Sequence, residues 1–143
     1  MALSLKDPET VIAVMVGEPE RRSFIEAISA ADTRLVSAPT MLETGMVVLC
    51  RTGEGRLQDL RDFCARGAVE MVPFGPEHVE LAVDAFRRFG KGRHPAGLDF
   101  GDCFSYALAK ATGEPLLFKG FDFSQSDIKR AEYKVSGCPP ALC

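Results

Sequence analysis

The stretch LDFGDCFSYALAKATGEPLLFKGFDFSQSDI, residues 98–128, carries the pattern of a helix, a short buried strand and a loop. Asp99 and Asp102 stand three apart at the start of the helical pattern, where the positive end of a helix dipole stabilises negative charge. Gly113 is placed to end this helix in a left-handed cap. The apolar run 115–118, bounded by Pro and Gly, then predicts a short buried strand. The stretch therefore predicts acidic groups at one edge of a sheet.

The rest of the chain alternates between strand and helix patterns. Strands are predicted at 3–6, 34–38 and 69–73, and helices at 11–16, 18–31, from Pro39, 56–66 and 76–89, with a polar turn at 51–55. This alternation predicts an α/β fold with a central parallel sheet of four to five strands flanked by helices. We predict a single domain over residues 1–133 and a flexible C-terminal tail at 134–143.

Apolar residues at helical spacing predict which side of the helix at 76–89 is buried. The residues expected to face inward are Val79, Ala82, Val83 and Phe86. In the helix from Pro39, Glu43 is surrounded in the sequence by apolar residues, and an acid on a buried side needs a partner. This position of Glu43 favours a functional role for the carboxylate.

Length and composition restrict the class of protein. A chain of 143 residues with 46% hydrophobic residues is enough for one core but too short for two large domains. A formal charge of −3 argues against a generally basic nucleic-acid binder, so any RNA contact is expected to be a local patch. The sequence has no signal-peptide pattern and no membrane-spanning run, which predicts a cytoplasmic protein. Five cysteines without a CxxC spacing predict neither a disulfide framework nor a zinc site.

Four acids follow different predicted elements but can reach the same edge of a parallel sheet: Asp7, Glu43, Asp102 and Asp122. A cluster of carboxylates without a cation is costly, because each raises the pKa of the others. Mg²⁺ and Mn²⁺ prefer oxygen ligands and resolve this repulsion. We therefore predict a metal-dependent site for hydrolysis at phosphorus.

Each acid also has a purely structural interpretation when taken alone. Asp7 before Pro8 and Asp99 are both placed as helix N-caps. Asp102 is placed to compensate a helix dipole, and Asp122 is a residue type common in turns. Convergence of four acids on one edge is the observation that favours the metal site.

A basic loop, GKGRHPAG at 90–97, directly precedes the opening stretch. Its Lys91, Arg93 and His94, together with Arg51 and Lys119, are the candidates for contacts to an RNA backbone. Such contacts would give salt-dependent affinity without choosing a sequence. The alternative interpretation is an ordinary solvated loop.

The chain resembles the PIN-domain ribonucleases, and among them the VapC toxins of toxin–antitoxin pairs. The phrases that carry the resemblance are VIAVMVGEPE (11–20), SAPTMLET (37–44) and GRHPAGLDFGDCFSYALAKATGEPLLFKGFDFSQSDI (92–128). The resemblance implies a PIN-like domain in which Asp7, Glu43, Asp102 and Asp122 bind Mg²⁺ or Mn²⁺. It also implies an endoribonuclease acting on tRNA or rRNA loops, a homodimer with its interface around 40–66, and inhibition by a small VapB-type antitoxin.

The sequence departs from the family pattern at two places. The family usually continues its first acid with Thr-Ser-Ala, whereas Pro8, Glu9 and Thr10 follow Asp7 here. Thr10 or Glu9 is then left to complete the metal site, or metal binding is altered. Phe121 also stands where these toxins commonly have an acidic or amide residue.

Two other functions are compatible with the sequence. Asp7-Pro-Glu9-Thr10 has a faint resemblance to the phosphatase signature of haloacid dehalogenase-like proteins, in which the first Asp is a phosphorylated nucleophile. The second Asp of that signature is missing, and the chain leaves little room for a cap. The other alternative is a catalytically impaired PIN-like module that only binds a partner or dimerises.

Overall fold

A computed structural model describes residues 2–5, 8–19, 21–118 and 122–132, and for 2–5, 8–9 and 122 it describes the backbone alone. The elements follow in this order: β1 (Ala2–Leu5), α1 (Pro8–Val16), α2 (Arg21–Ala30), β2 (Thr33–Ser37), α3 (Ala38–Thr52), α4 (Glu54–Arg66), β3 (Val69–Val72), α5 (Pro76–Phe89), α6 (Phe100–Thr112), β4 (Leu116–Leu117) and the 3-10 helix η1 (Asp122–Gln125). The predicted α/β class is confirmed. The predicted tail at 134–143 lies outside the described residues.

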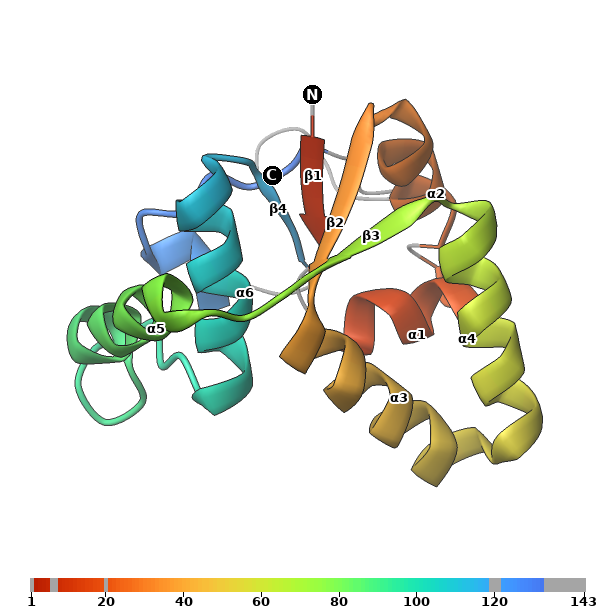
Figure 1. Cartoon of the computed structure of the whole chain (residues 1–143), viewed down its shortest axis with the longest axis horizontal. Helices are drawn as coiled ribbons and strands as arrows, with labels where there is room; N and C mark the ends of the chain where they lie inside the picture. The colour runs from red at the N-terminus through yellow and green to blue at the C-terminus, as the bar shows by residue number, and fades with distance from the viewer. Residues whose placement is uncertain (1, 6–7, 20, 119–121, 133–143) are drawn as a thin grey trace.

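The strands form a parallel sheet in the order β3-β2-β1-β4. Leu5 pairs with Leu117 at the ends of β1 and β4, and Ser37 pairs with Val72 at the ends of β2 and β3. Because all pairs are parallel, the carboxyl ends of the strands lie along one edge of the sheet (Figure 1). Helices α3 and α6 both have their first turns at this edge.

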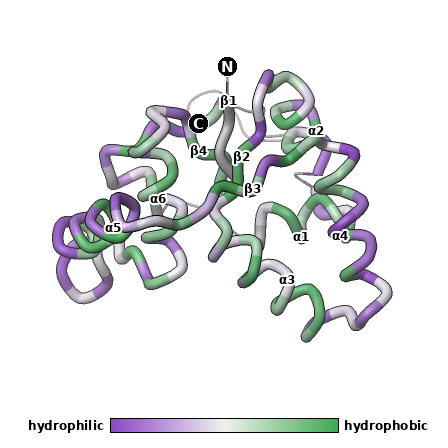
Figure 2. The backbone as a smooth tube through the Cα atoms, viewed as in Figure 1, coloured by the Kyte–Doolittle hydropathy of each residue, from purple (hydrophilic) through white to green (hydrophobic). Residues whose placement is uncertain are grey.

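Helices cover both faces of the sheet. Figure 1 shows α5 and α6 on one side and α1 to α4 on the other. Strand β4 illustrates how the two layers share a core, because successive side chains of a strand point to opposite faces. Leu117 packs with residues of α1 and α2, whereas Leu116 and Phe118 pack with residues of α6. Within the layer of α1 to α4, Figure 2 shows hydrophobic residues along α1 and hydrophilic residues along much of α4.

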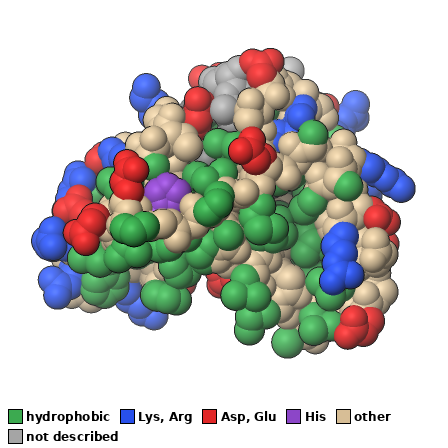
Figure 3. Space-filling model, in the orientation of Figure 1, with side chains coloured by type: hydrophobic (Ala, Val, Ile, Leu, Met, Phe, Trp, Pro, Cys, Tyr) green, Lys and Arg blue, Asp and Glu red, His purple; other side chains and the backbone are tan. Residues whose placement is uncertain are grey.

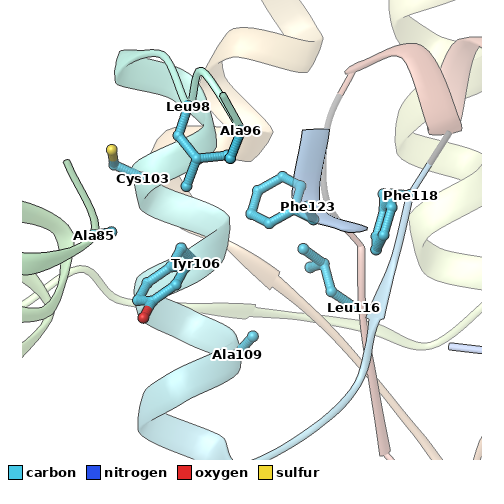
Figure 4. Close-up of a cluster of buried hydrophobic side chains, with 9 residues drawn as sticks. All are labelled: Ala85, Ala96, Leu98, Cys103, Tyr106, Ala109, Leu116, Phe118 and Phe123. Atoms are coloured by element: carbon cyan, nitrogen blue, oxygen red, sulfur yellow. The ribbon is translucent and has the colours of Figure 1, made fainter. Parts of the chain in front are cut away.

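The core on the α6 side holds the segment after β4 in place. Phe123 of η1 is fully buried between α6 and β4 (Figure 4), and its ring lies 5.4 Å from the ring of Phe118. Leu98 and Tyr106 belong to the same cluster and are also buried. Burial of aromatic rings of this size contributes on the order of 2 kcal/mol each. The packing therefore fixes η1 next to the first half of α6.

The prediction for the connection between α3 and α4 was wrong. The turn predicted at 51–55 is limited to Gly53, because α3 extends to Thr52 and α4 begins at Glu54. Gly53 makes this sharp change of direction with φ of 82°, a backbone conformation that favours glycine. The last residues of α3, 49–52, and the first residues of α4, 54–56, are all exposed. Both helices therefore extend beyond the buried apolar residues from which they were predicted.

The apolar stripe of α5 was predicted to face the core, but most of it lies at the surface. Val79, Val83 and Phe86 are 44%, 50% and 41% exposed. The side of α5 that packs against α6 is instead centred on Ala85, which is fully buried (Figure 4). The small side chain lets the two helices approach closely, and Ala82 packs beside it. The larger apolar residues are thereby rotated outward.

Candidate metal-dependent active site

The first turn of α6 is fixed by two reciprocal hydrogen bonds. The Asp102 backbone N–H donates to Asp99 Oδ1 at 2.9 Å, and the Asp99 backbone N–H donates to Asp102 Oδ2 at 3.0 Å. This is a capping box, so the predicted N-cap role of Asp99 is confirmed. Gly113 ends the helix with φ of 70°, as predicted. The box holds the Asp102 carboxylate at the start of the helix rather than leaving it to rotate.

Helix α3 is attached to α6 through two buried hydroxyl groups. Thr40 Oγ1 and Ser105 Oγ are 3.2 Å apart, and their residues are 2% and 0% exposed. Either hydroxyl can be the donor, so the pair satisfies both groups within the protein. Glu43 comes one turn after Thr40 on α3, and Gly101 comes one turn before Ser105 on α6. The hydroxyl pair therefore sets the distance between these two turns.

The carboxylate of Glu43 lies directly against Gly101. A Cβ atom placed on Gly101 would be 2.8 Å from Glu43 Oε2 and 3.2 Å from Oε1. Glu43 was interpreted as an acid in apolar surroundings, and this was wrong: the residue is exposed, and Leu42 and Met46 beside it are 66% and 58% exposed. Its side chain instead reaches across to α6. The structure thus brings Glu43 to the turn that carries Asp102.

The negative charge at the first turn of α6 affects the pKa of the neighbouring Cys103 thiol. Burial, together with the negative charges of Asp102 and Asp99, raises the pKa of Cys103 to about 11. A thiol with this pKa is protonated at neutral pH and is a poor nucleophile. The first turn of α6 is therefore an electronegative region that suits a cation and not a thiolate.

The remaining two predicted ligands are not described as side chains. Asp7 lies outside the described residues, between the ends of β1 and α1 in the sequence. Asp122 opens η1, and its backbone is described but its side chain is not. Within the described ranges, no group of three His, Cys, Asp or Glu residues is arranged to hold a metal ion. Thr10, a candidate to complete the site, is fully buried in the first turn of α1.

An ionic network that the sequence did not predict ties the segment after η1 to α5 and α6. Asp127 accepts hydrogen bonds from Tyr106 Oη at 2.8 Å and from Arg88 at 3.1 Å, and Lys110 Nζ lies 2.7 Å from it. Burial opposes ionisation of Asp127, but the hydrogen bonds from Lys110, Tyr106 and Arg88 prevail and lower its pKa to about 2. Burial and the bond to Asp127 also raise the pKa of Tyr106. The network anchors the chain five residues beyond Asp122.

The basic candidates that the structure describes lie in the loop between α5 and α6 and at the far end of α3 from the strand edge. Lys91 and Arg93 are exposed in the loop between α5 and α6, and Arg51 is exposed in the last turn of α3. His94 has a structural role in that loop, because its Nδ1 accepts a hydrogen bond from the Ala96 N–H at 3.0 Å. The guanidinium of Arg93 lies 5.6 Å from the centre of the Phe86 ring. Lys119 lies outside the described residues.

The donors at the strand edge fit a hard divalent cation. Glu43 and Asp102 offer carboxylate oxygens, the ligand type that Mg²⁺ and Mn²⁺ prefer. The close approach of Glu43 to Gly101 leaves no side chain between this carboxylate and the α6 turn. Fold and donor set together define a class: parallel α/β domains with an acidic site at the carboxyl edge of the sheet, as in metal-dependent nucleases.

Comparison with known proteins agrees with this class and gives the family. Residues 7–129 match the PIN domain. Ribonuclease VapC30 of Mycobacterium tuberculosis is 43% identical over 122 residues, which cover 85% of this chain and 93% of the relative. Ribonuclease VapC of Mycolicibacterium smegmatis is 40% identical over 122 residues, covering 85% and 95%. The chain belongs to the PIN-domain family and, within it, to the VapC ribonucleases.

Solved structures show the same fold at low sequence identity. VapC20 of Mycobacterium tuberculosis, described as a sarcin-ricin loop cleaving toxin, superposes with a TM-score of 0.70 at 15% identity, covering 88% of this chain and 95% of that one. VapBC2 of Rickettsia felis, bound to a DNA fragment from its promoter, gives 0.69 at 14% identity, covering 94% and 100%. Among the described residues of the present chain, no helix has the length and apolarity needed to cross a membrane.

Proposed function

We propose that this VapC ribonuclease is a Mg²⁺- or Mn²⁺-dependent endoribonuclease toxin that cleaves structured RNA, in tRNA or rRNA loops, in the cytoplasm. The observation that supports a metal-dependent reaction is the meeting of Glu43 with the Asp102 turn. Carboxylates brought to the same turn repel one another, and a bound cation or a proton offsets this repulsion. An RNA loop as substrate is supported by the description of VapC20 as a toxin that cleaves the sarcin-ricin loop.

Four carboxylates would hold the cation: Asp7, Glu43, Asp102 and Asp122. When bound, Mg²⁺ or Mn²⁺ supplies polarisation of water for attack at phosphorus and stabilises charge on the leaving oxygen. The protein contributes by orienting the ligands. Asp99 holds Asp102 through the capping box, and the Thr40–Ser105 pair holds the two helices at the distance that places Glu43.

The RNA backbone would be held by the basic candidates named from the sequence. These are Arg51, Lys91, Arg93, His94 and Lys119. Arg51 lies in the last turn of α3, and Lys91 and Arg93 lie between α5 and α6, so an RNA strand would have to extend well beyond the acidic site to touch both groups. Contacts of this kind give salt-dependent affinity without reading bases, so the choice of RNA would depend on loop shape and stacking.

A small VapB-type antitoxin is the proposed inhibitor. The structures related to this chain include VapBC2 of Rickettsia felis and a toxin–antitoxin complex from Klebsiella pneumoniae, the latter with a TM-score of 0.64 at 19% identity. A basic side chain of the antitoxin would neutralise the carboxylates in place of the cation. Coexpression with the adjacent open reading frame is expected to yield a complex whose RNA cleavage is suppressed.

A homodimer is the proposed assembly, and two exposed apolar surfaces support it. One lies on α3, within the predicted range 40–66, and consists of Leu42, Met46 and Leu49. The other is a hollow of about 600 Å³ between α5 and α6, lined by Phe74, Val79, Ala82, Val83, Phe86, Phe100, Cys103 and Phe104. Figure 3 shows hydrophobic side chains gathered over α5 and over the centre of the same face. Exposed apolar patches of this kind are typical of protein interfaces.

The test of the function is cleavage of total cellular RNA with Mn²⁺ or Mg²⁺, for the wild type, Asp102→Asn and Asp122→Asn. Asp59→Asn is the matched control, because this acid pairs only loosely with Arg56 on the exposed side of α4, at 3.6 Å. We expect cleavage by the wild type and the control, and loss of cleavage in both site variants and after chelation. Equal cleavage by all four proteins would contradict the proposed site. Absence of cleavage by a folded wild type would favour the binding module, and a phosphoenzyme lost in Asp7→Asn would favour the phosphatase.

A further inference from the structure

Gly101 occupies the second position of α6, where its lack of a side chain has a specific consequence. Glycine inside a helix is unfavourable relative to alanine, since it loses more backbone entropy on folding. At this position, however, a Cβ would lie 2.8 Å from Glu43 Oε2, 3.2 Å from Oε1 and 3.3 Å from Cδ. All three contacts are shorter than ordinary van der Waals distances. The volume that a methyl group would take is therefore filled by the Glu43 carboxylate.

We propose that Gly101 is a positioning residue of the metal site: it lets the carboxylate of Glu43 reach the first turn of α6, next to Asp102. The inference rests on the proposed function and adds a residue that ligates nothing itself. Asp102 is fixed by its capping box, so the cation site is completed only if Glu43 comes to it. A side chain at position 101 would hold Glu43 away from this turn.

The consequence of adding a methyl group would fall on Glu43 and not on the fold. The atoms that a Cβ would strike belong to the end of a long, exposed side chain, which can rotate away, and no backbone atom is among them. The Thr40–Ser105 pair would still hold α3 to α6. Gly101→Ala is therefore expected to fold and to melt no lower than the wild type, because alanine is the better helix former.

The variant Gly55→Ala is a matched control. Gly55 also occupies the second position of its helix, α4, and nothing lies within 4 Å of a Cβ placed there. Both variants gain the same helix propensity, but only Gly101→Ala displaces a carboxylate. Any difference between them in metal binding thus reports the contact with Glu43.

The experiment is calorimetric titration of the full-length, metal-free protein with MnCl₂, with a thermal melt of each variant. Gly101→Ala is expected to weaken Mn²⁺ binding about tenfold or more, the usual effect of losing a group that orients a ligand. Gly55→Ala is expected to bind as the wild type does. Wild-type affinity in Gly101→Ala would overturn the inference, and so would a loss that Gly55→Ala shares.

A double-mutant cycle separates positioning from a general structural role. Glu43→Gln should weaken Mn²⁺ binding in the wild type but change little in Gly101→Ala, where the carboxylate is already displaced. Independent, multiplying effects of the two substitutions would overturn the inference. The variant Asp102→Asn identifies which proposal has failed. If Asp102→Asn binds Mn²⁺ as the wild type does, the proposed metal site is wrong. If Asp102→Asn binds Mn²⁺ weakly but Gly101→Ala binds it normally, only the role of Gly101 is contradicted.

Discussion

The substitution Asp127→Asn removes the negative charge of a carboxylate that contacts Arg88, Tyr106 and Lys110. These contacts join the segment after η1 to α5 and α6. Asparagine has nearly the same shape and can still accept the hydrogen bond from Tyr106. The substitution therefore tests the charge of Asp127 more than its packing. We expect a loss of stability that depends on pH.

The magnitude follows from the lowered pKa. A change from the ordinary value of 3.8 to about 2 corresponds, at about 1.36 kcal/mol per pH unit, to roughly 2.5 kcal/mol. The side chain is 35% exposed, so solvent screening reduces the expected contribution to about 1 kcal/mol. Because the pKa is lower in the folded state, this stability is fully present above about pH 3.8 and is lost as the pH falls toward 2.

The assay is thermal unfolding of the wild type and Asp127→Asn at pH 6 and at pH 2.5. At pH 6 the variant is expected to melt about 3 °C lower, and at pH 2.5 this difference should shrink. Asp62→Asn is the control, because the hydrogen bond that Asp62 accepts from Gln58 lies on the exposed side of α4. The reasoning would be refuted if the difference in melting temperature between the wild type and Asp127→Asn were the same at both pH values. It would also be refuted if this difference were no larger than that of the control.

Three further outcomes are expected. Phe100→Ser removes an 80% exposed ring beside the apolar hollow and should shift the protein from dimer to monomer in light scattering; an unchanged mass would exclude this surface. Thr40→Val removes the hydrogen bond between Thr40 and the buried Ser105 hydroxyl and should cost about 1–2 kcal/mol in urea unfolding. Ser105→Ala should restore part of this loss, and simple addition of the two losses would argue against the bond. Iodoacetamide at pH 8 should modify the exposed Cys50 well before the buried Cys103, whose pKa is raised to about 11. Modification of Cys103 before Cys50 would contradict the burial of Cys103.

The sequence was sufficient for the parts of the fold that depend on local signals. The N-cap at Asp99, the left-handed cap at Gly113 and the strand after Pro115 all follow from short-range preferences, and the structure has them where they were predicted. Alternation of strands and helices was likewise enough for the parallel α/β class. From that class followed the expectation that residues after different strands share one edge.

Contacts between elements could not be predicted in the same way. Periodicity showed that Val79, Val83 and Phe86 share one side of α5, but an apolar side can face either a core or a protein partner. Ala85, the residue that packs against α6, gives a weaker signal because it is small. Glu43 was chosen for its apolar neighbours, although what places it is Gly101, a residue far away in the sequence. A glycine inside a helical pattern next to a candidate ligand was the available signal.

The most direct test of the metal site is anomalous diffraction from a crystal of this protein grown with Mn²⁺. We expect an anomalous peak at the first turn of α6, within about 2.3 Å of a carboxylate oxygen of Asp102 and joined to Glu43 directly or through water. A peak bound elsewhere on the protein, with Glu43 and Asp102 making no contact to it, would contradict a hydrolytic site at this edge of the sheet.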